Sequence, residues 1–488
     1  MKRNGAGITI IFLICFLSVE LWRGDSANIA SHLKVHIKDV QEMDCEVHRQ
    51  GCKLKLSAVG TAKEVDSKAQ EHQSDFYMQQ RRDAIAKACA RLPPQDISRN
   101  MHHAMTSRLH RFLYCPVEKS ASTFWRRFMY QLVLTQPMQS PFDVSVQTVY
   151  SGKFPISQVQ VTESGEALDK MLLSFTKMLF IREPYSRLLS AYVDKLLAPN
   201  PILWSMWGLP SVALCHEPAT KPWCKDRSGY IRHQQNIFPA GDVEQPVSKV
   251  GLDGTASTSC GEDVTFPEYV KLATTTLART NAHVMPIYRM CSPCYVNYTV
   301  IGHMETFDKD VRLLLPKINV TESQVNLEKM DANVAYDAIE DSVHDSMSKA
   351  WLKQSLKCIS KLEVVRRIWR KLQIRGFISW RIKPSDFNLD HLSVLNMDGP
   401  ALIKVLVSAN GRSSNKTELK LQKKQALKEA YSLLQPDQLK EISDTFGPDF
   451  TLFGFQQRPK AFEDFSRADF INTGALDLSK DWSMERVL

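Results

Sequence analysis

The segment RFLYCPVEKSASTFWRRFMYQL, from Arg111 to Leu132, holds a first group of residues that could bind an anion. An apolar run ends at Cys115, and Lys119 and four small residues lead into a pattern that predicts a helix. The first N–H groups of a helix lack intrahelical partners and, with the helix dipole, favour a negative charge. The small residues that would let a phosphate reach the backbone are Ser120, Ala121, Ser122 and Thr123. The alternative is an ordinary capped helix with an exposed lysine, since the pattern G-x-x-x-x-G-K-[ST] is absent.

A second group follows the next apolar run, in the segment KMLFIREPYSRLLSAY. Arg182 comes directly after the run, and Ser190 falls within the first two turns of the predicted helix. A guanidinium at the carboxyl end of a strand, with a hydroxyl nearby, can grip a phosphate, and ligands of open α/β sheets collect at that edge. The alternative is a surface ion pair of Arg182 with Glu183 or Asp194. Two such groups predict a ligand with two separated anionic ends.

These residues need a sheet that brings both turns to one edge. Four short apolar runs predict buried strands, at 111–115, 177–181, 283–288 and 298–302. Three amphipathic patterns predict helices, at 122–133, 185–197 and 266–278. Strands that alternate with helices predict an α/β fold of three layers, in which helices flank a mostly parallel sheet.

The texture of the sequence predicts six parts. They are a cytosolic tip and signal-anchor segment (1–22), a lumenal stem (23–107), the core (108–316), a variable insertion with a basic helical stretch (317–430), a C-terminal part of the core (431–456) and a tail (457–488). Residues 199–262 break the alternation and contain Cys215, Cys224 and Cys260, which predicts a disulfide-tied loop region. The apolar segment 446–455 is expected to dock on the core, and the tail to be surface-like or disordered.

The N-terminus predicts entry into the secretory pathway. Lys2 and Arg3 precede an apolar run from Ala6 to Val19, and basic residues before such a run stay in the cytosol. The run is shorter than the roughly 20 residues that span a bilayer, so it is either a cleaved signal peptide or a short anchor. Ten of the 11 cysteines remain when Cys15 is set aside, which suits disulfides in an oxidising lumen. The predicted N-glycosylation sites are Asn297, Asn319 and Asn415.

Composition adds the sign of the charge. The chain is 43% hydrophobic and 24% charged, as in ordinary globular proteins, and its net charge of +9 suits either an acidic partner or simple solubility. One segment, from 346 to 383, is strongly basic, with 11 Lys or Arg residues and one Glu. Four of them, Lys349, Lys353, Lys357 and Lys361, are spaced for one helix face, which either binds an acidic glycan or is merely solvated. Trp351, Trp369 and Trp380 interleave with this run and either stack on sugars or pack in the core.

The ordered set of segments resembles the Golgi carbohydrate sulfotransferases, a family that includes chondroitin and dermatan 4-O-sulfotransferases. CPVEKSASTFWRR resembles the family's loop for the 5-prime-phosphosulfate of 3-prime-phosphoadenosine 5-prime-phosphosulfate (PAPS), and FIREPYSRLLSAY resembles its 3-prime-phosphate motif. NAHVMPIYRMCSPC (281–294), YTVIGHMET (298–306) and DFTLFGF (449–455) match further segments in the family's order. The sequence departs from the family at Glu118, Glu183 and Val284, which stand where Pro, Asp and Trp are usual.

The resemblance implies a P-loop-NTPase-like sulfotransferase fold and a PAPS-binding site that needs no metal. Cys291-Ser-Pro-Cys294 is half of a zinc motif, but no second such pair follows, so disulfides are expected instead. Lys119 is expected to stabilise the leaving phosphate, in a reaction that depends on positioning and charge. The residues expected to bind PAPS are Lys119, Ser120, Ala121, Ser122, Thr123, Arg182 and Ser190.

A base must take the proton of the acceptor hydroxyl, and histidine is the natural type. His283 in the third matching segment is the expected base and His303 is its rival, although either can be purely structural. A carboxylate at Glu118 would repel the phosphosulfate unless it points away or pairs with Arg126 or Arg127.

The expected function is transfer of a sulfuryl group from PAPS to a glycan hydroxyl, with N-acetylgalactosamine of chondroitin or dermatan as the expected acceptor. The expected partners are that acidic glycan and a membrane, not nucleic acid. The expected location is the Golgi membrane, as a single-pass type II protein, or outside the cell if the N-terminus is cleaved. Two alternatives are a kinase that uses ATP and a non-catalytic secreted glycan-binding protein, which Glu118 favours.

Overall fold

The computed structural model describes residues 62–93, 103–133, 140–150, 161–215, 224–225, 249–250, 256–257, 260–322, 324–327, 330–459 and 474–482. The chain divides into two units, Met1–Glu71 and His72–Leu488, and the fold and site described below belong to the second. The predicted signal-anchor segment, 1–22, lies outside the described residues. No helix within the described ranges is long and apolar enough to cross a membrane.

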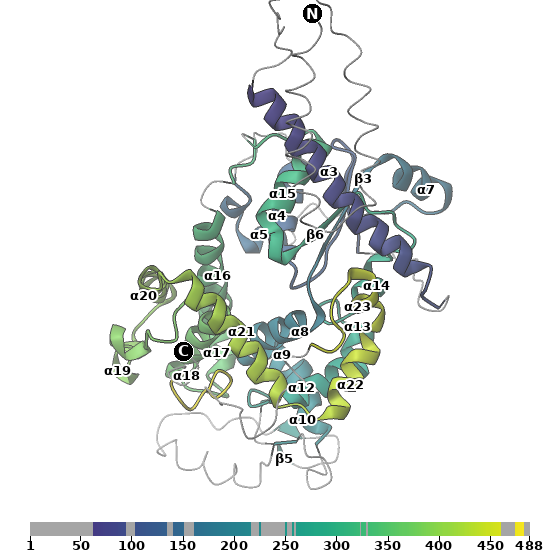
Figure 1. The fold of residues 1–488 in the computed structure, drawn as a ribbon. Coiled ribbons are helices and arrows are strands. Elements are labelled where there is room, and N and C mark those ends of the chain that lie inside the picture. The colour runs from purple at the N-terminus through teal and green to yellow at the C-terminus, as the bar shows by residue number, and fades with distance from the viewer. Residues whose placement is uncertain are drawn as a thin grey trace, which may run out of the picture. The chain divides into compact units, whose positions relative to one another are not determined.

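One four-stranded sheet organises the second unit (Figure 1). Its strands, in spatial order, are β1 (Met105–Ser107), β2 (Phe112–Cys115), β3 (Thr176–Ile181) and β6 (Val300–His303). β1 is antiparallel to β2, whereas β2, β3 and β6 are parallel, with Cys115 opposite Leu179 and Leu179 opposite Ile301. β4 (Lys249–Val250) and β5 (Ala256–Ser257) form a separate antiparallel pair. The predicted α/β class with a mostly parallel sheet is confirmed, although β1 comes from residues predicted as stem.

Helices cover both faces of this sheet, because alternate residues of a strand point to opposite sides. Phe112 and Phe180 on one face pack with Trp125 of α4 (Ser122–Val133) and Phe307 of α15 (Phe307–Leu314). On the other face, the cluster contains Leu113, Cys115, Leu179 and Ile181 of the sheet, residues of α14 (Ile287–Cys291), and Ile85 and Ala88 of α3 (Ala62–Cys89). The predicted three layers are therefore present.

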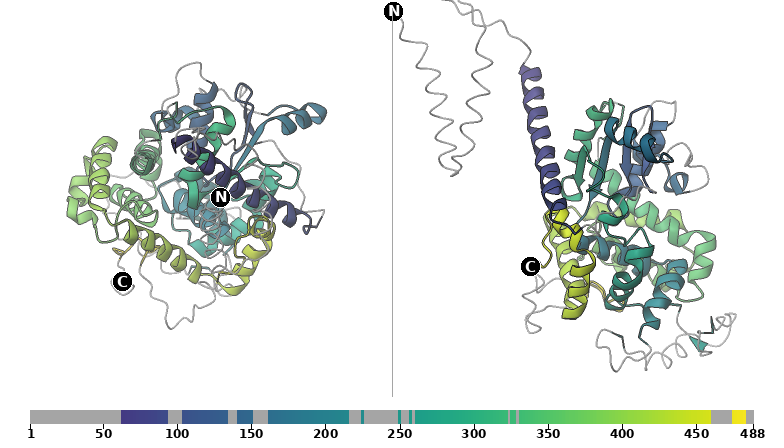
Figure 2. Two further views of the ribbon diagram at one scale, coloured as in Figure 1. Left: turned by 45° about the horizontal axis from the view of Figure 1, so that its top comes forward. Right: turned by 90° about the vertical axis from the view of Figure 1, so that its right-hand side faces the viewer.

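A large helical part lies beyond the carboxyl ends of the parallel strands. Figure 1 shows α8, α12, α18 and α21 below the sheet, and the right-hand view of Figure 2 shows the green and yellow helices on the same side. The helices of this part with seven or more residues are α8 (Pro184–Tyr192), α12 (Phe266–Leu272), α16 (Met330–Met347), α17 (Lys349–Ser355), α18 (Lys361–Ile374), α20 (Gly399–Arg412), α21 (Lys416–Ser432), α22 (Pro436–Thr445) and α23 (Gly447–Phe453). The second unit also contains α5 (Val146–Tyr150), α7 (Gly165–Ser174), α9 (Pro201–Leu203), α10 (Leu209–Ala213), α13 (Ala278–Thr280) and α19 (His391–Leu395).

The helices predicted beside the two turns are confirmed. The pattern at 122–133 forms α4 with the same bounds. The pattern at 185–197 forms α8 and then one π-helical turn, η3 (Val193–Leu197). The pattern at 266–278 forms α12, which a second π-helical turn, η6 (Ala273–Leu277), extends.

The strand predicted at 283–288 is wrong, because this segment is a turn that leads into α14. The carboxylate of Asp449 accepts the N–H groups of Ile287 at 2.7 Å and Tyr288 at 2.8 Å, and Pro286 precedes them. These are the first amides of α14, which otherwise lack partners. The cap comes from α23, so the predicted docking of segment 446–455 on the core is confirmed and explains the helix.

Disulfides hold the core, as the cysteine count predicts. Among the described residues, four bridges join Cys89–Cys294, Cys115–Cys291, Cys215–Cys224 and Cys260–Cys358. The pair at 291 and 294 therefore serves two different bridges rather than a metal. Within the described ranges, no cluster of three or more His, Cys, Asp or Glu residues is arranged to hold a metal ion.

Two expectations for the C-terminal half are wrong. Lys349 and Lys361 do not share a helix, because α17 ends at Ser355 and α18 begins at Lys361, where Ser360 Oγ caps the N–H of Glu363 at 3.2 Å. The tail was expected to be surface-like or disordered, but its described part, 474–482, packs against α18. Ala475 and Trp482 are buried there, and the Arg370 guanidinium donates to the carbonyl oxygens of residues 474, 475, 477 and 480.

Candidate active site at the Lys119 and Arg182 turns

The turn between β2 and α4 has the backbone of an anion cradle. Lys119 has φ +69° and Ala121 has φ +61°, while Ser120 between them is not in the left-handed region. Left-handed backbone is unfavourable for residues other than glycine, and alternation of this kind points successive N–H groups into one concavity. The hydroxyl of Ser120 is buried and has no hydrogen-bond partner in the described structure. The turn therefore offers donors that a bound anion would satisfy.

The negative charge of Glu118 is balanced by its neighbours. It accepts hydrogen bonds from Ser122 Oγ at 2.5 Å and Arg126 at 3.0 Å, while Arg127 pairs with Asp337 instead. Burial alone would raise the pKa of Glu118, but the charges of Arg126 and His283 and the Ser122 hydrogen bond outweigh burial and hold that pKa at about 2. Glu118 is thus ionised and paired with Arg126, one of the two partners predicted.

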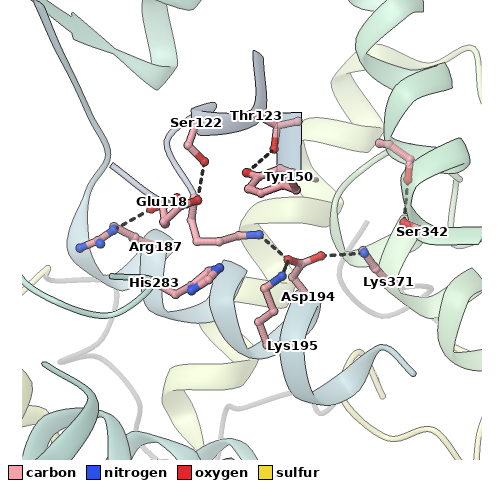
Figure 3. Close-up of polar contacts among 12 residues, drawn as sticks. Glu118, Ser122, Thr123, Tyr150, Arg187, Asp194, Lys195, His283, Ser342 and Lys371 are labelled. Atoms are coloured by element: carbon pink, nitrogen blue, oxygen red, sulfur yellow. Dashed lines mark hydrogen bonds and ion pairs between the residues drawn. The ribbon is translucent and has the colours of Figure 1, made fainter. Parts of the chain in front are cut away.

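This pairing changes the expected role of two hydroxyls. Ser122 Oγ is engaged with Glu118, and Thr123 Oγ1 lies 3.2 Å from the hydroxyl of Tyr150 (Figure 3). The backbone N–H groups of both residues still belong to the first turn of α4. The backbone N–H groups of Ser122 and Thr123 are therefore better placed to bind an anion than their hydroxyls. From the sequence, both residues were expected to bind PAPS.

Lys119 belongs to a group of three lysines around one carboxylate. Asp194, in η3, accepts Lys119 Nζ at 2.6 Å and Lys195 Nζ at 3.1 Å through Oδ2, and Lys371 Nζ at 2.7 Å through Oδ1 (Figure 3). Burial and the charge of Lys195 lower the pKa of Lys119 to about 8, against the attraction of Asp194. Burial would raise the pKa of Asp194, but the three ammonium groups hold it well below its usual range. Three ammonium groups thus meet at one carboxylate beside the Lys119 turn.

His283 lies in the same neighbourhood (Figure 3). The Oδ1 atom of Asn281 lies 3.0 Å from the backbone N of His283 and 3.0 Å from its ring Nδ1. A backbone N–H can only donate, so the shared atom is an oxygen, Nδ1 carries the proton and Nε2 has the free lone pair. Burial and the charges of Lys195 and Lys119 lower the pKa of His283 to about 4, so the ring is neutral at pH 7. A neutral ring with a bare Nε2 can accept a proton.

His303, the rival base, has different surroundings. Its backbone N–H donates to Asp310 at 2.8 Å, and its ring packs against Phe455 with centroids 5.9 Å apart. Burial and the charge of Arg81 lower its pKa to about 4. The charged groups that influence His303 are Arg81 and Asp310, whereas those around His283 include Lys119. Of the two rings, His283 is the one whose charge interacts with Lys119.

Arg182 meets the Lys119 turn directly. Its Nη1 donates to the carbonyl oxygen of Lys119 at 2.9 Å, so both predicted anion-binding turns lie at one edge of the sheet. The ion pair considered as an alternative does not form among the described residues, because Glu183 caps α8 by accepting from Tyr185 N at 2.8 Å and Ser186 N at 2.7 Å. Ser190 is half-buried in α8, and no hydrogen bond joins its hydroxyl to Arg182 in the described ranges.

Two residues of this region escaped the sequence reasoning. The buried Arg187 donates to three carbonyl oxygens, those of Glu118 at 3.0 Å, Met285 at 2.7 Å and Ala282 at 2.8 Å. It therefore braces the Lys119 turn against the His283 segment. The sequence feature that could have identified Arg187 is its position on the buried face of the predicted helix. No sequence feature identifies Lys371, since it lies in the predicted insertion.

The basic run at 346–383 has more than one role. Arg367, Arg370 and Lys371 are buried and make internal contacts, while Lys349, Lys353 and Lys357 are exposed. Trp369 and Trp380 are 2% and 4% exposed, so they pack in the core rather than present open faces for sugars. With Trp482 they border a cavity of about 620 Å³ against α18, whose lining includes neither Lys119 nor Arg182. The three predicted glycosylation sites, Asn297, Asn319 and Asn415, are all exposed.

Comparison with known proteins gives a consistent result. The model of the sulfotransferase family matches residues 102–371. Carbohydrate sulfotransferase 12 of Mus musculus is 26% identical over 298 residues, which are 57% of this chain and 64% of that protein. Carbohydrate sulfotransferase 8 of Homo sapiens is 27% identical over 49% of each chain, and carbohydrate sulfotransferase 14 of Homo sapiens is 29% identical over 44% of this chain and 46% of its own. The match thus spans about half to two thirds of these relatives, and no solved structure matches.

Proposed function

Because the chain belongs to the sulfotransferase family, we propose that it transfers a sulfuryl group from PAPS to a hydroxyl of a glycan. The observation that carries the proposal is the hydrogen bond from Arg182 to the carbonyl oxygen of Lys119. It brings two cationic turns together at the carboxyl edge of the sheet, where ligands of α/β folds bind. A nucleotide with phosphates at both its 5-prime and 3-prime positions has the two anionic ends that such a pair of turns requires.

The Lys119 turn suits the 5-prime end of the donor. Its alternating backbone, the unpartnered hydroxyl of Ser120 and the first amides of α4 would hold phosphate oxygens. The ammonium of Lys119 would stabilise negative charge on the leaving phosphate oxygen, which is the kind of fixed electrostatic help that lowers barriers most. Arg182 and Ser190 would hold the 3-prime phosphate. The donor supplies the activated sulfur–oxygen bond.

The acceptor hydroxyl would lose its proton to Nε2 of His283. The oxygen of the acceptor hydroxyl forms the new bond to sulfur, and the bond from sulfur to the phosphate oxygen breaks. Adenosine 3-prime,5-prime-bisphosphate leaves with the electron pair of the broken bond. The hydrogen bond from Nδ1 to Asn281 fixes the tautomer that this role needs. Arg187 would act by positioning, since it ties the carbonyl oxygens next to Lys119 and His283 together.

The acceptor that we propose is N-acetylgalactosamine of chondroitin- or dermatan-type chains. Similarity to proteins named carbohydrate sulfotransferases supports a glycan, and the exposed Lys349, Lys353 and Lys357 suit an acidic one. We place the enzyme in the Golgi membrane, anchored by its N-terminal segment, with the catalytic unit in the lumen. The four disulfides support an oxidising compartment.

A transfer assay tests the proposal. The purified chain is incubated with radiolabelled PAPS and desulfated chondroitin, dermatan and neutral glycans, and the labelled product is digested for disaccharide analysis. The proposal expects label on galactosamine units. Glycan binding without any transfer would support the non-catalytic alternative, whose main argument is weakened because Glu118 is paired with Arg126. Stabilisation by ATP with magnesium, but not by adenosine 3-prime,5-prime-bisphosphate, would support the kinase.

A further inference from the structure

Two cations outside every matched motif lie next to each other. Arg375 directly follows α18, and the chain then turns at Gly376, which has φ +74°. A Cβ at Gly376 would lie 3.0 Å from a backbone oxygen of α21 and 3.8 Å from the Cβ of Lys423. The turn that follows Arg375 therefore packs directly on α21 at Lys423, and the charges of Arg375 and Lys423 interact.

A buried glutamine fixes this arrangement. Gln422, which has no exposed surface, donates from Nε2 to the carbonyl oxygens of Gln373 at 2.6 Å and Ile378 at 2.8 Å. Its Oε1 accepts the backbone N–H of Trp380 at 2.8 Å. Since buried polar groups are costly to leave unpaired, these three bonds lock the turn at 373–380 to the helix that carries Lys423.

The same helix packs against α8, which begins two residues after Arg182. The hydroxyl of Tyr431 in α21 donates to the carbonyl oxygen of Tyr185 at 2.8 Å, and the two rings meet with centroids 5.0 Å apart. Arg182 in turn donates to the carbonyl oxygen of Lys119. The insertion thereby packs on the helix that follows the Arg182 turn, and the charges of Arg375 and Lys423 interact with that of Arg182.

The charges of these three residues act on one another. Burial and then the charge of Arg375 lower the pKa of Arg182 to about 10, and burial among the surrounding elements and the charges of Arg182 and Arg375 lower the pKa of Lys423 to about 8. Lys423 nevertheless stays exposed, so an anion from solution can reach it. Glu305 opposes both shifts, but no ion pair joins Arg375 or Lys423 to a carboxylate within the described ranges. Positive charge is left without an ion-pair partner at Arg375 and Lys423.

We propose that Arg375 and Lys423 complete the pocket for the donor's 3-prime phosphate that Arg182 begins, and that they set the preference for a nucleotide carrying that phosphate. This inference rests on the proposed function and assigns a role to the 317–430 segment. A phosphate monoester carries about −1.5 to −2 charge near pH 7. A guanidinium can bind it through two parallel hydrogen bonds, and an ammonium adds a compact charge. A 3-prime hydroxyl offers neither attraction, so the pocket would discriminate between the two nucleotides.

Calorimetric titration of the full chain with two nucleotides tests this inference. Adenosine 3-prime,5-prime-bisphosphate carries the phosphate in question, and adenosine 5-prime-monophosphate lacks it. The variants are Arg375→Ala and Lys423→Ala, and the matched control is Lys424→Ala, an exposed neighbour on the same helix. Because a hydrogen bond to a charged group is worth more than a neutral one, each test variant should lose about 10- to 100-fold in affinity for the bisphosphate. Affinity for the monophosphate should change less than about twofold, and Lys424→Ala should affect neither ligand.

Three other outcomes overturn the inference in distinguishable ways. If both test variants keep the wild-type preference for the bisphosphate, the pocket does not use these residues, while the proposed function stands. If a variant loses both nucleotides in the same proportion, the change damages the site as a whole, and the specific role is wrong. If the wild-type chain binds neither nucleotide, the proposed function fails, and this inference fails with it. Melting temperatures of all variants show whether they fold.

Discussion

Replacing Asp194 with asparagine tests how the charge of Lys119 is maintained. The substitution keeps the size of the side chain and one hydrogen-bond acceptor but removes the negative charge that three lysines contact at 2.6 to 3.1 Å. Lys119 already has a pKa of only about 8, because burial and Lys195 oppose the attraction of Asp194. Without that attraction, Lys119 would hold its proton less tightly, and its role at the leaving phosphate requires the proton.

The size of the effect follows from the geometry. Two charges about 4 Å apart near a protein surface attract by about 4 kcal/mol, and the hydrogen bond that asparagine retains offsets about 1.5 kcal/mol. The remaining ~2.5 kcal/mol lowers the proton affinity of Lys119 by roughly 100-fold, so the alkaline limb of kcat/KM should move from about pH 8 to about pH 6. At pH 7.4 the protonated fraction then falls by about 20-fold, whereas at pH 6 it falls by about twofold.

The assay is the pH dependence of kcat/KM for sulfuryl transfer, which reports groups of the free enzyme. Asp194→Asn should show about a 20-fold loss at pH 7.4 that shrinks to about twofold at pH 6. The matched control is Asp308→Asn, which removes a carboxylate from an exposed pair with Arg312 and should leave the profile unchanged. An alkaline limb that stays near pH 8 in Asp194→Asn would refute the reasoning, as would an equal loss at every pH in a variant with normal thermal stability.

The remaining predictions concern other residues of the site. Lys119→Ala should lower kcat by roughly 10²- to 10³-fold in the transfer assay, and a loss below about tenfold would contradict its role. In the wild-type chain kcat/KM should rise as the pH increases through about 4, because His283 loses its proton there. It should fall as the pH increases through about 8, because Lys119 loses its proton there. In His283→Ala the acidic limb of the pH profile should disappear, together with most of the activity. Arg187→Lys should lower the free energy of unfolding in urea by about 1.5–3 kcal/mol and reduce kcat more than it raises KM, because the lysine cannot reach all three carbonyl oxygens; an unchanged kcat would show that the brace is only structural.

Local signals in the sequence were enough for the two turns. The bounds of α4 follow from small polar residues ahead of an apolar period, and both features lie within 111–133. Arg182 directly follows an apolar run that forms β3, and parallel strands bring their carboxyl ends to one edge, so its meeting with Lys119 could be predicted. The pairing of Glu118 with Arg126 also follows from residues eight apart in the same segment.

Features that depend on distant residues could not be predicted. The helix α14 replaces an expected strand because its cap, Asp449, lies about 160 residues further along the chain. The tautomer of His283 depends on how Asn281 folds back on it, which spacing alone does not reveal. Lys371 meets Asp194 only because α18 packs beside η3, and no local pattern marks this lysine among its basic neighbours. In each case tertiary packing decides which residues contact the site.

The central claim is that the Lys119 and Arg182 turns hold opposite ends of one nucleotide. A crystal structure of the chain with adenosine 3-prime,5-prime-bisphosphate tests it most directly. We expect the 5-prime phosphate within hydrogen-bond distance of the backbone N–H groups at 120–123 and the 3-prime phosphate in contact with Arg182. A nucleotide bound elsewhere, or with either phosphate away from its turn, would contradict the claim.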